Sequence, residues 1–270
     1  MRVAVGQLAP VADVRANLTR IESLAAASER REAELLLLPE ESMFSAGTGG
    51  ARLAEVAEPI DGPFAKSLAS IAAERSLAIV AGMYEANGDQ PPYNTLVAVD
   101  ARGELVGSYR KMHLYDAFDY RESDTVTPGD GVPVSIELAG LRIGLLNCYD
   151  LRFPELARVL AEQGCHVLAT SAAWVRGPRK KAHWRTLLRA RAIENTVWVA
   201  AAGALGESYL GHSVVVAPSG DVLFELDGCT QGIAVTDVRA CDVSEVRRTL
   251  PSLANRRITV SAQVLPGGRA

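Results

Sequence analysis

Cys148 stands where a strand is expected to give way to a helix. The apolar run 143–146 is typical of a buried strand, and Pro154 and Glu155 suit the first turn of a helix. Amides at the start of a helix favour the thiolate of a nearby cysteine, which is its nucleophilic form. This position makes Cys148 a candidate nucleophile, although free cysteines are more often inert packing.

A cysteine nucleophile needs a base and a group that stabilises an oxyanion. Two charged residues stand at the ends of expected strands. Glu40 follows the apolar run 35–38 and Pro39, and Lys111 follows the expected strand 104–109. Burial at such a strand end would shift the pKa of either group. Taken singly, each residue is better explained as a solvated loop charge, because acids and lysines are common in loops.

The elements that must hold these residues alternate between strands and helices, with hairpins inserted. Hydrophobic periodicity and turn residues predict strands at 2–8, 35–38, 77–83, 93–99, 104–109, 134–138, 141–146, 166–170, 197–202, 213–217, 222–226 and 231–238. Helices are expected at 13–30, from Pro63 onward, and at 155–163, 180–195 and 243–250. This order predicts mixed sheets covered by helices in a single domain.

Composition narrows the class of protein. The chain has 270 residues, of which 48% are hydrophobic and 22% charged, with a net charge of −4; these values are ordinary for a globular protein. Its basic residues are spread along the chain, so no nucleic-acid partner is expected, and no apolar run approaches the length of a membrane span. The four cysteines and four histidines show no metal-binding spacing. With no signal peptide in evidence, a cytoplasmic location is expected.

Three motifs in order carry a resemblance to a known family. They are the apolar strand that ends in Pro-Glu at 35–41, the segment Tyr-Arg-Lys-Met-His-Leu-Tyr-Asp at 109–116, and Asn-Cys-Tyr-Asp-Leu-Arg-Phe-Pro-Glu-Leu at 147–156. On these motifs the chain resembles the nitrilase, or carbon–nitrogen hydrolase, superfamily. The resemblance runs nearly end to end and includes the segment 183–195, which is similar to the family's His-Trp…Ile-Glu-Asn helix.

The resemblance implies an α/β fold, a four-layer αββα sandwich that forms one domain over residues 1–262, with a C-terminal tail over 263–270. It also implies an enzyme that uses no cofactor and no metal. Members of the family usually pair through helices to extend the sandwich, so a homodimer or a larger homo-oligomer is expected.

The resemblance also assigns roles, residue by residue. Cys148 is the nucleophile that attacks the amide carbon and forms a thioester. Glu40 is the general base, which takes the thiol proton and later activates water. Lys111 stabilises the oxyanion together with the backbone N–H of Tyr149. Glu122 matches the family's second glutamate, which orients the lysine or the substrate carbonyl; a surface loop acid is the alternative for this residue.

The motifs also bear on which carbon–nitrogen bond is cleaved. Nitrile-cleaving members typically have Trp-Glu after the cysteine, whereas this chain has Tyr149 and Asp150, so a nitrile substrate is disfavoured. The chain resembles the amidase branch that includes deaminated glutathione amidases and omega-amidases. Such a substrate is anionic, which makes Arg152 and Arg176 candidate binding residues. The alternatives are a structural salt bridge for Arg152 and a surface charge on a loop for Arg176.

Three rival interpretations stay open. The chain could be an omega-amidase or another hydrolase of small amides or N-carbamoyl compounds. It could be a catalytically silent binding member of the fold, although the presence of Glu40, Lys111 and Cys148 together argues against this. It could also be a thiol redox protein that uses Cys148, although no cysteine lies near it in the sequence.

Overall fold

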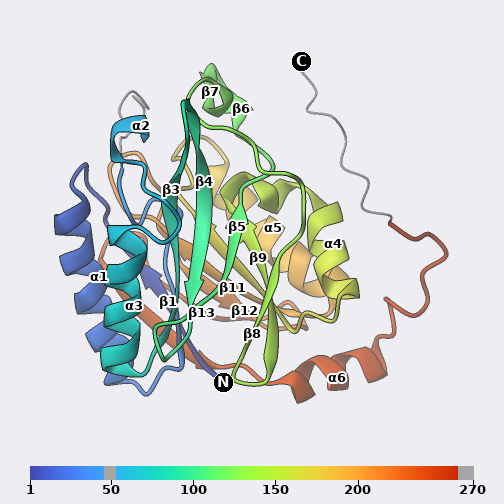
Figure 1. Cartoon of the computed structure of the whole chain (residues 1–270). Coiled ribbons are helices and arrows are strands. Elements are labelled where there is room, and N and C mark those ends of the chain that lie inside the picture. The colour runs from blue at the N-terminus through green and yellow to red at the C-terminus, as the bar shows by residue number, and fades with distance from the viewer. Residues whose placement is uncertain (46–52, 261–270) are drawn as a thin grey trace.

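Two six-stranded sheets lie face to face between two pairs of helices in the computed structural model, which describes residues 1–45 and 53–260 (Figure 1). The first sheet has the order β14-β1-β2-β3-β4-β5. Its strands span Gly232–Asp237 (β14), Arg2–Gln7 (β1), Leu35–Leu37 (β2), Ala78–Asn87 (β3), Gln90–Val99 (β4) and Leu105–Arg110 (β5). The second sheet has the order β13-β12-β11-β10-β9-β8. Its strands span Val222–Glu225 (β13), Val214–Val216 (β12), Trp198–Gly203 (β11), Val167–Ala172 (β10), Leu141–Asn147 (β9) and Ser135–Leu138 (β8).

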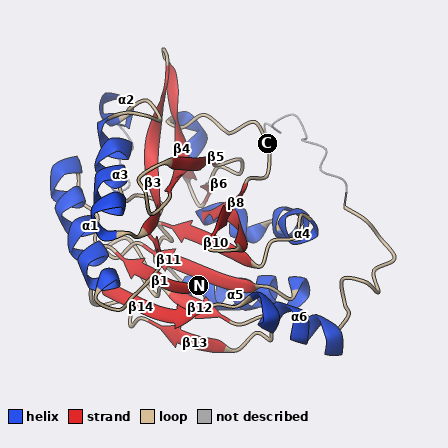
Figure 2. Ribbon diagram, turned by 60° about the horizontal axis from the view of Figure 1, so that its bottom comes forward, coloured by secondary structure: helices blue, strands red, loops and turns tan. Residues whose placement is uncertain are grey.

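Helices cover the outer face of each sheet, as Figure 2 shows. On the first sheet lie α1 (Val14–Glu29) and α3 (Pro63–Arg75), and on the second lie α4 (Pro154–Glu162) and α5 (Lys180–Asn195). Smaller elements are α2 (Leu53–Val56), α6 (Ala240–Thr249), the hairpin of β6 (Asp116–Ala117) and β7 (Tyr120–Arg121), and 3-10 turns at Glu122–Asp124 and Cys148–Arg152. The arrangement is the expected αββα sandwich in one domain. The expected tail, 263–270, lies outside the described residues.

Local sequence explains where α1, α3 and α4 begin. The Asp13 side chain caps α1 by accepting a hydrogen bond from the Ala16 N–H at 2.9 Å. Pro63 and Pro154 occupy the first turns of α3 and α4, where a missing N–H costs nothing. Apolar residues on one face of α1, such as Ile21 and Leu24, are buried together with residues of α3 and the first sheet. None of the helices in the described ranges is long and apolar enough to cross a membrane.

The strand directions bring several carboxyl ends to one edge. β1, β2 and β3 are parallel, and β5 shares their direction because β4 is antiparallel to both β3 and β5. In the second sheet, β9, β10 and β11 are parallel. The Ser171 hydroxyl at the end of β10 donates to the Leu38 carbonyl after β2 at 2.7 Å. The segments that follow β2 and β10 therefore meet between the two sheets.

A glycine on β3 makes room for the segment after β2. A Cβ atom at Gly82 would lie 1.6 Å from the Glu40 carbonyl oxygen. The Gly82 N–H donates to the Pro39 carbonyl at 3.1 Å, and its own carbonyl accepts from the Met43 N–H at 3.1 Å. Only glycine allows this approach, so β3 forms one wall behind Glu40.

β3 and β4 are longer than the sequence predicts and form a hairpin that it did not indicate. β3 and β4 extend beyond the expected 77–83 and 93–99 and pair around Gly88, which has φ +57°. A register shift between Glu85 and Asn87 takes up the irregularity near the two prolines of β4. Polar residues and prolines conceal this extension from a reading of periodicity.

Candidate active site

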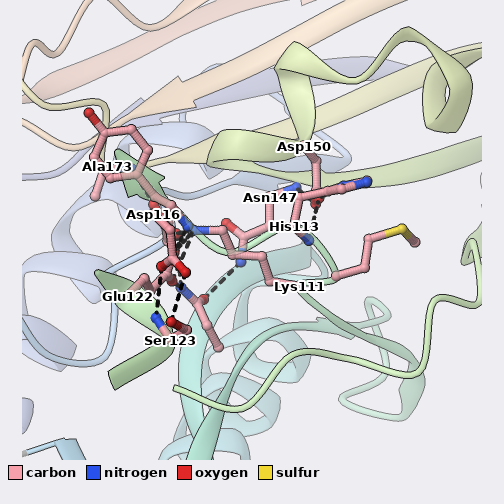
Figure 3. A network of polar contacts seen from close by, with 12 residues as sticks. Lys111, His113, Asp116, Glu122, Ser123, Asn147, Asp150 and Ala173 are labelled. Carbon is pink, nitrogen blue, oxygen red and sulfur yellow. Dashed lines mark hydrogen bonds and ion pairs between the residues drawn. The ribbon is translucent and has the colours of Figure 1, made fainter. Parts of the chain in front are cut away.

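A lysine and two glutamates form a buried charge cluster at the shared edge of the sheets (Figure 3). The Lys111 Nζ atom lies 2.8 Å from Glu40 Oε1 and 2.7 Å from Glu122 Oε2. All three residues are at most 6% exposed. This burial rules out the interpretation of these residues as solvated loop charges. The structure thus brings together three of the residues that the sequence selected.

Glu40 is held from three sides. Its Oε1 atom accepts from Lys111 Nζ and from the Asn94 side-chain amide at 2.8 Å, and its Oε2 atom accepts from the Ala173 N–H at 2.7 Å. Burial alone would raise the pKa of Glu40. The charge of Lys111, with hydrogen bonds from Lys111 and the Ala173 N–H, outweighs burial and lowers that pKa below its ordinary value. Glu40 is therefore a carboxylate at neutral pH, which is the form a base requires.

Lys111 remains charged for the complementary reason. Burial lowers its pKa, but the charges of Glu122 and Glu40 outweigh burial and raise the pKa well above its ordinary value. Its ammonium is the buried cation that makes two neighbouring carboxylates tolerable.

Glu122 anchors the lysine from the loop that carries the β6–β7 hairpin. It opens a 3-10 turn, and its carboxylate accepts from the Tyr115 N–H at 2.7 Å as well as from Lys111. Asn94 donates to it at 3.1 Å. Glu122 is therefore a buried member of the charge cluster, and the alternative expected from the sequence, a surface loop acid, is wrong.

Cys148 occupies a constrained turn directly after β9. It has a left-handed backbone with φ +49°, which is uncommon for a residue other than glycine. Asp150, which is fully buried, holds the turn: its carboxylate accepts from the Asn147 N–H at 2.9 Å and from the Tyr109 hydroxyl at 2.7 Å. His113 Nδ1 lies 2.7 Å from the same carboxylate. These contacts hold the turn that carries the thiol, and the thiol lies close enough to Glu40 for each group to shift the pKa of the other.

The expectation that helix amides favour the Cys148 thiolate is wrong for this site. Burial and the negative charge of Glu40 raise the pKa of Cys148 well above its ordinary value, and the opposing charge of Lys111 does not offset them. The residues after Cys148 form a short 3-10 turn, and α4 begins only at Pro154. The sulfur is consequently a thiol at neutral pH, and its activation requires proton transfer to a base.

Asn94 joins the cluster to the cysteine turn and was not found in the sequence. It is 3% exposed; its Oδ1 atom accepts from the Asn147 side chain at 2.8 Å, while its Nδ2 atom donates to Glu40 and Glu122. The available signal was a polar residue at the start of the apolar run 96–99. A buried amide can donate and accept at once, which is what this position requires.

Two further predicted residues, Tyr149 and Arg152, lie on the same 3-10 turn as Cys148. Tyr149 is the second residue of the 3-10 turn, where a backbone N–H has no partner within the helix. The Arg152 guanidinium is 4.9 Å from the centre of the Trp174 ring and 5.9 Å from that of Tyr149. Within 1–45 and 53–260, Arg152 forms no ion pair, so the expected salt-bridge alternative is not observed.

Arg176 is exposed, and its guanidinium donates to two backbone carbonyls. It donates to the Gly206 carbonyl at 3.2 Å and to the Gly228 carbonyl at 3.3 Å. The structure therefore places Arg152, and not Arg176, against the residue that follows Cys148.

Comparison with known proteins fixes the family. The family model for carbon-nitrogen hydrolases matches residues 2–248. This chain belongs to the carbon–nitrogen hydrolase family.

Individual relatives of this carbon–nitrogen hydrolase are amidases. A deaminated glutathione amidase of Escherichia coli O157:H7 is 35% identical over 257 residues, which cover 95% of this chain and 97% of the relative. An omega-amidase of Homo sapiens is 34% identical over 253 residues, covering 89% of each chain. A solved mutant amidase of Nesterenkonia, with acrylamide added at its active-site cysteine, has a TM-score of 0.79 and 30% identity and covers 94% of this chain and 99% of that one. The protein is an amidase of the nitrilase superfamily.

One half-buried acid of the amidase, Glu41, gives its stability a specific pH dependence. Burial and the charge of Glu40 raise the pKa of Glu41 to about 7, despite hydrogen bonds from Ser45 and Tyr209. Between its ordinary value of 4.5 and about 7, the folded state therefore binds more protons at Glu41 than the unfolded state does. Stability should fall as pH rises through this window, with a slope of up to about 1.4 kcal/mol per pH unit. Urea unfolding of wild type and Glu41→Gln across the window measures this slope.

Glu41→Gln should remove most of that slope, since its amide does not titrate. Glu104→Gln is the matched control, because Glu104 is exposed on the β4–β5 turn. Equal slopes for Glu41→Gln and wild type would show that Glu41 titrates normally.

Proposed function

We propose that this amidase hydrolyses a small amide that carries a carboxylate, with deaminated glutathione as its substrate, through a thioester on Cys148. The observation that carries the proposal is the buried cluster of Glu40, Lys111 and Glu122 beside the Cys148 thiol. The relative named deaminated glutathione amidase supports the choice of substrate.

The first half of the reaction forms the thioester. The Glu40 carboxylate takes the Cys148 proton as the sulfur attacks the amide carbon. The carbonyl oxygen becomes an oxyanion, which the Lys111 ammonium and the Tyr149 N–H stabilise. When the tetrahedral intermediate collapses, the carbon–nitrogen bond breaks and the protonated Glu40 gives its proton to the departing amine.

The second half hydrolyses the thioester. Glu40, again a carboxylate, takes a proton from water as the water oxygen attacks the thioester carbon. A second oxyanion forms at the same position beside Lys111. Its collapse breaks the carbon–sulfur bond, and Glu40 returns the proton to Cys148 as the carboxylic acid leaves. One base thus serves both steps, and the lowered pKa of Glu40 keeps it ionised before each of them.

Glu122 acts through the lysine as a positioning residue. It accepts from Lys111 Nζ with both oxygens, at 2.7 and 3.0 Å. This contact leaves Glu40 free to exchange a proton while a full negative charge remains beside the ammonium.

Arg152 is the proposed partner of the carboxylate on the acyl portion of the substrate. It is half-buried over Tyr149 and Trp174 and has no acidic partner in the described part of the chain. The catalytic cluster places two carboxylates around one ammonium, so an anionic substrate requires a cation elsewhere. Arg176 is a weaker candidate, because backbone carbonyls already occupy its guanidinium.

An omega-amidase is the second candidate, favoured by the human relative. A substrate panel separates the two: deaminated glutathione, α-ketoglutaramate, N-carbamoyl amino acids and simple nitriles, with acid product measured in each case. Preference for deaminated glutathione supports the proposal. Preference for α-ketoglutaramate supports omega-amidase activity instead.

Glu40→Gln should reduce turnover by between about 100-fold and 10,000-fold, the usual contribution of a general acid or base. Glutamine keeps the shape and can still accept from the Ala173 N–H, but it cannot take the thiol proton. Initial rates of acid release measure the loss. Glu41→Gln is the matched control one residue along the chain and should stay active; near-normal rates for Glu40→Gln would remove Glu40 from the mechanism.

The setting of the reaction is part of the same proposal. We place the amidase in the cytoplasm, as a homodimer or larger homo-oligomer, in the repair of damaged metabolites. The family resemblance supports the assembly and the repair role, and the cysteine usage supports the cytoplasm.

A further inference from the structure

Lys180, the first residue of α5, is a nearly buried cation. It is 9% exposed. Its Nζ atom donates to the Tyr115 hydroxyl at 2.7 Å and lies 4.8 Å from the centre of the Tyr115 ring and 4.5 Å from that of Phe118. In the parts of the chain that the structure describes, no acidic side chain lies within ion-pairing distance of it.

This arrangement is uncommon for a lysine. Lysines are almost never fully buried unless they are paired, and the desolvation of an ammonium is costly. Two aromatic faces and one neutral hydroxyl stabilise the charge only in part. An anion would complete the environment of Lys180.

The residues that contact Lys180 lie next to the catalytic cluster. The Tyr115 ring packs edge-on against Tyr149 with centres 5.1 Å apart, and the Tyr115 N–H donates to Glu122. On the other side, the Lys180 carbonyl accepts from the Trp174 indole at 3.1 Å. Trp174 follows Ala173, whose N–H holds Glu40. Tyr115 therefore connects Lys180 to Glu122, and the segment 173–174 connects it to Glu40.

Two cations near this site, Arg152 and Lys180, have no ion-pair partner among residues 1–45 and 53–260. Arg152 lies against Tyr149, the residue next to Cys148, whereas Lys180 lies against Tyr115, whose ring packs on that of Tyr149. If Arg152 binds the acyl portion next to Cys148, Lys180, which is separated from Tyr149 by the Tyr115 ring, remains available for a charge on the amine portion. The site has one cation for each end of a dianionic amide.

We propose that Lys180 binds a carboxylate on the amine portion of the substrate, so that the enzyme selects amides with a carboxylate on both sides of the scissile bond. This inference rests on the proposed amidase mechanism and narrows its substrate class. Deaminated glutathione has such a carboxylate on its terminal glycine, whereas α-ketoglutaramate has none on its leaving group.

The test compares two substrates that differ only at the distant end. They are deaminated glutathione and its analogue with a terminal glycinamide. Lys180→Met should lower kcat/KM for the first by about 10- to 100-fold, mainly through KM, as expected for a lost charge-assisted hydrogen bond. The glycinamide analogue should be hydrolysed at the same rate by both proteins. Lys181→Met, which changes the exposed neighbour, is the matched control, and Lys180→Arg should restore part of the loss.

Two results would overturn the proposal. One is a wild-type kcat/KM for Lys180→Met with the carboxylate-ended substrate. The other is an equal loss with both substrates, which would mean that Lys180 merely positions Tyr115 and the β6–β7 hairpin.

A second measurement separates failure of this proposal from failure of the proposed function. If neither substrate is hydrolysed, the proposed substrate is wrong, but Lys180 can still be tested by alkylation of Cys148 with 3-maleimidopropionate and with N-ethylmaleimide. A Michael acceptor adds to the active-site cysteine of the Nesterenkonia relative. The rate ratio of anionic to neutral reagent should fall at least about threefold in Lys180→Met if Lys180 attracts the carboxylate. An unchanged ratio would overturn the proposal. Rates are read on the Cys148 peptide, because Cys229 and Cys241 are exposed.

Discussion

Replacing Cys148 with alanine should reduce amide hydrolysis by about 10,000-fold or more and leave the protein folded. Loss of a covalent nucleophile removes the reaction path itself, and effects of this size are typical of such variants. Cys148 is the first residue of its turn, which Asp150 holds through Asn147 and Tyr109 without using the sulfur. The unfolding free energy should therefore change by only about 1 kcal/mol. Initial rates and urea unfolding measure the two effects.

Cys165→Ala is the matched control for this prediction. Cys165 is also buried, but it precedes β10 away from the charge cluster. Its replacement should preserve kcat whatever it does to stability. An unfolded Cys148→Ala protein would make Cys148 a structural residue, and normal turnover would exclude it as the nucleophile.

Replacing Lys111 with methionine should abolish activity and also destabilise the fold strongly. The substitution leaves Glu40 and Glu122 buried without their shared cation. Removal of one partner from a buried ion pair typically costs about 3–5 kcal/mol, because the remaining charge is uncompensated. Urea unfolding at neutral pH measures the loss.

A double variant shows whether uncompensated charge causes that instability. Lys111→Met with Glu122→Gln removes one of the two stranded carboxylates, so it should be more stable than Lys111→Met alone while remaining inactive. A Lys111→Met protein as stable as wild type would contradict the buried cluster. So would a double variant less stable than the single one, because repulsion between the carboxylates would then not be the cause.

The sequence predicts those parts of the site that depend on strand ends. Glu40 and Lys111 follow strands, and Cys148 follows β9, because a buried run that stops abruptly marks the edge of a sheet. The bounds of α5 were also predicted, since its apolar spacing continues to Asn195. The motif order added what periodicity lacks, namely that these three strand ends belong to one site.

The rest depends on contacts between residues far apart in the chain. Asn94 reaches Glu40, Glu122 and Asn147 only because β4 lies between β3 and β5. The raised pKa of Cys148 results from burial and from Glu40, neither of which local sequence reveals. Lys180 was expected as the first residue of its helix, but its aromatic partners, Tyr115 and Phe118, come from a distant loop, and the sequence did not indicate that contact.

The most direct test of the mechanism is detection of the acyl-enzyme. Wild-type protein is mixed with deaminated glutathione, quenched in acid within the first turnovers, and digested for mass analysis of the peptide that contains Cys148. The account predicts an added mass equal to the acyl portion of the substrate on Cys148, absent from Cys148→Ala and much reduced in Glu40→Gln. Product formation at full rate with no adduct on Cys148, together with an active Cys148→Ala variant, would contradict it.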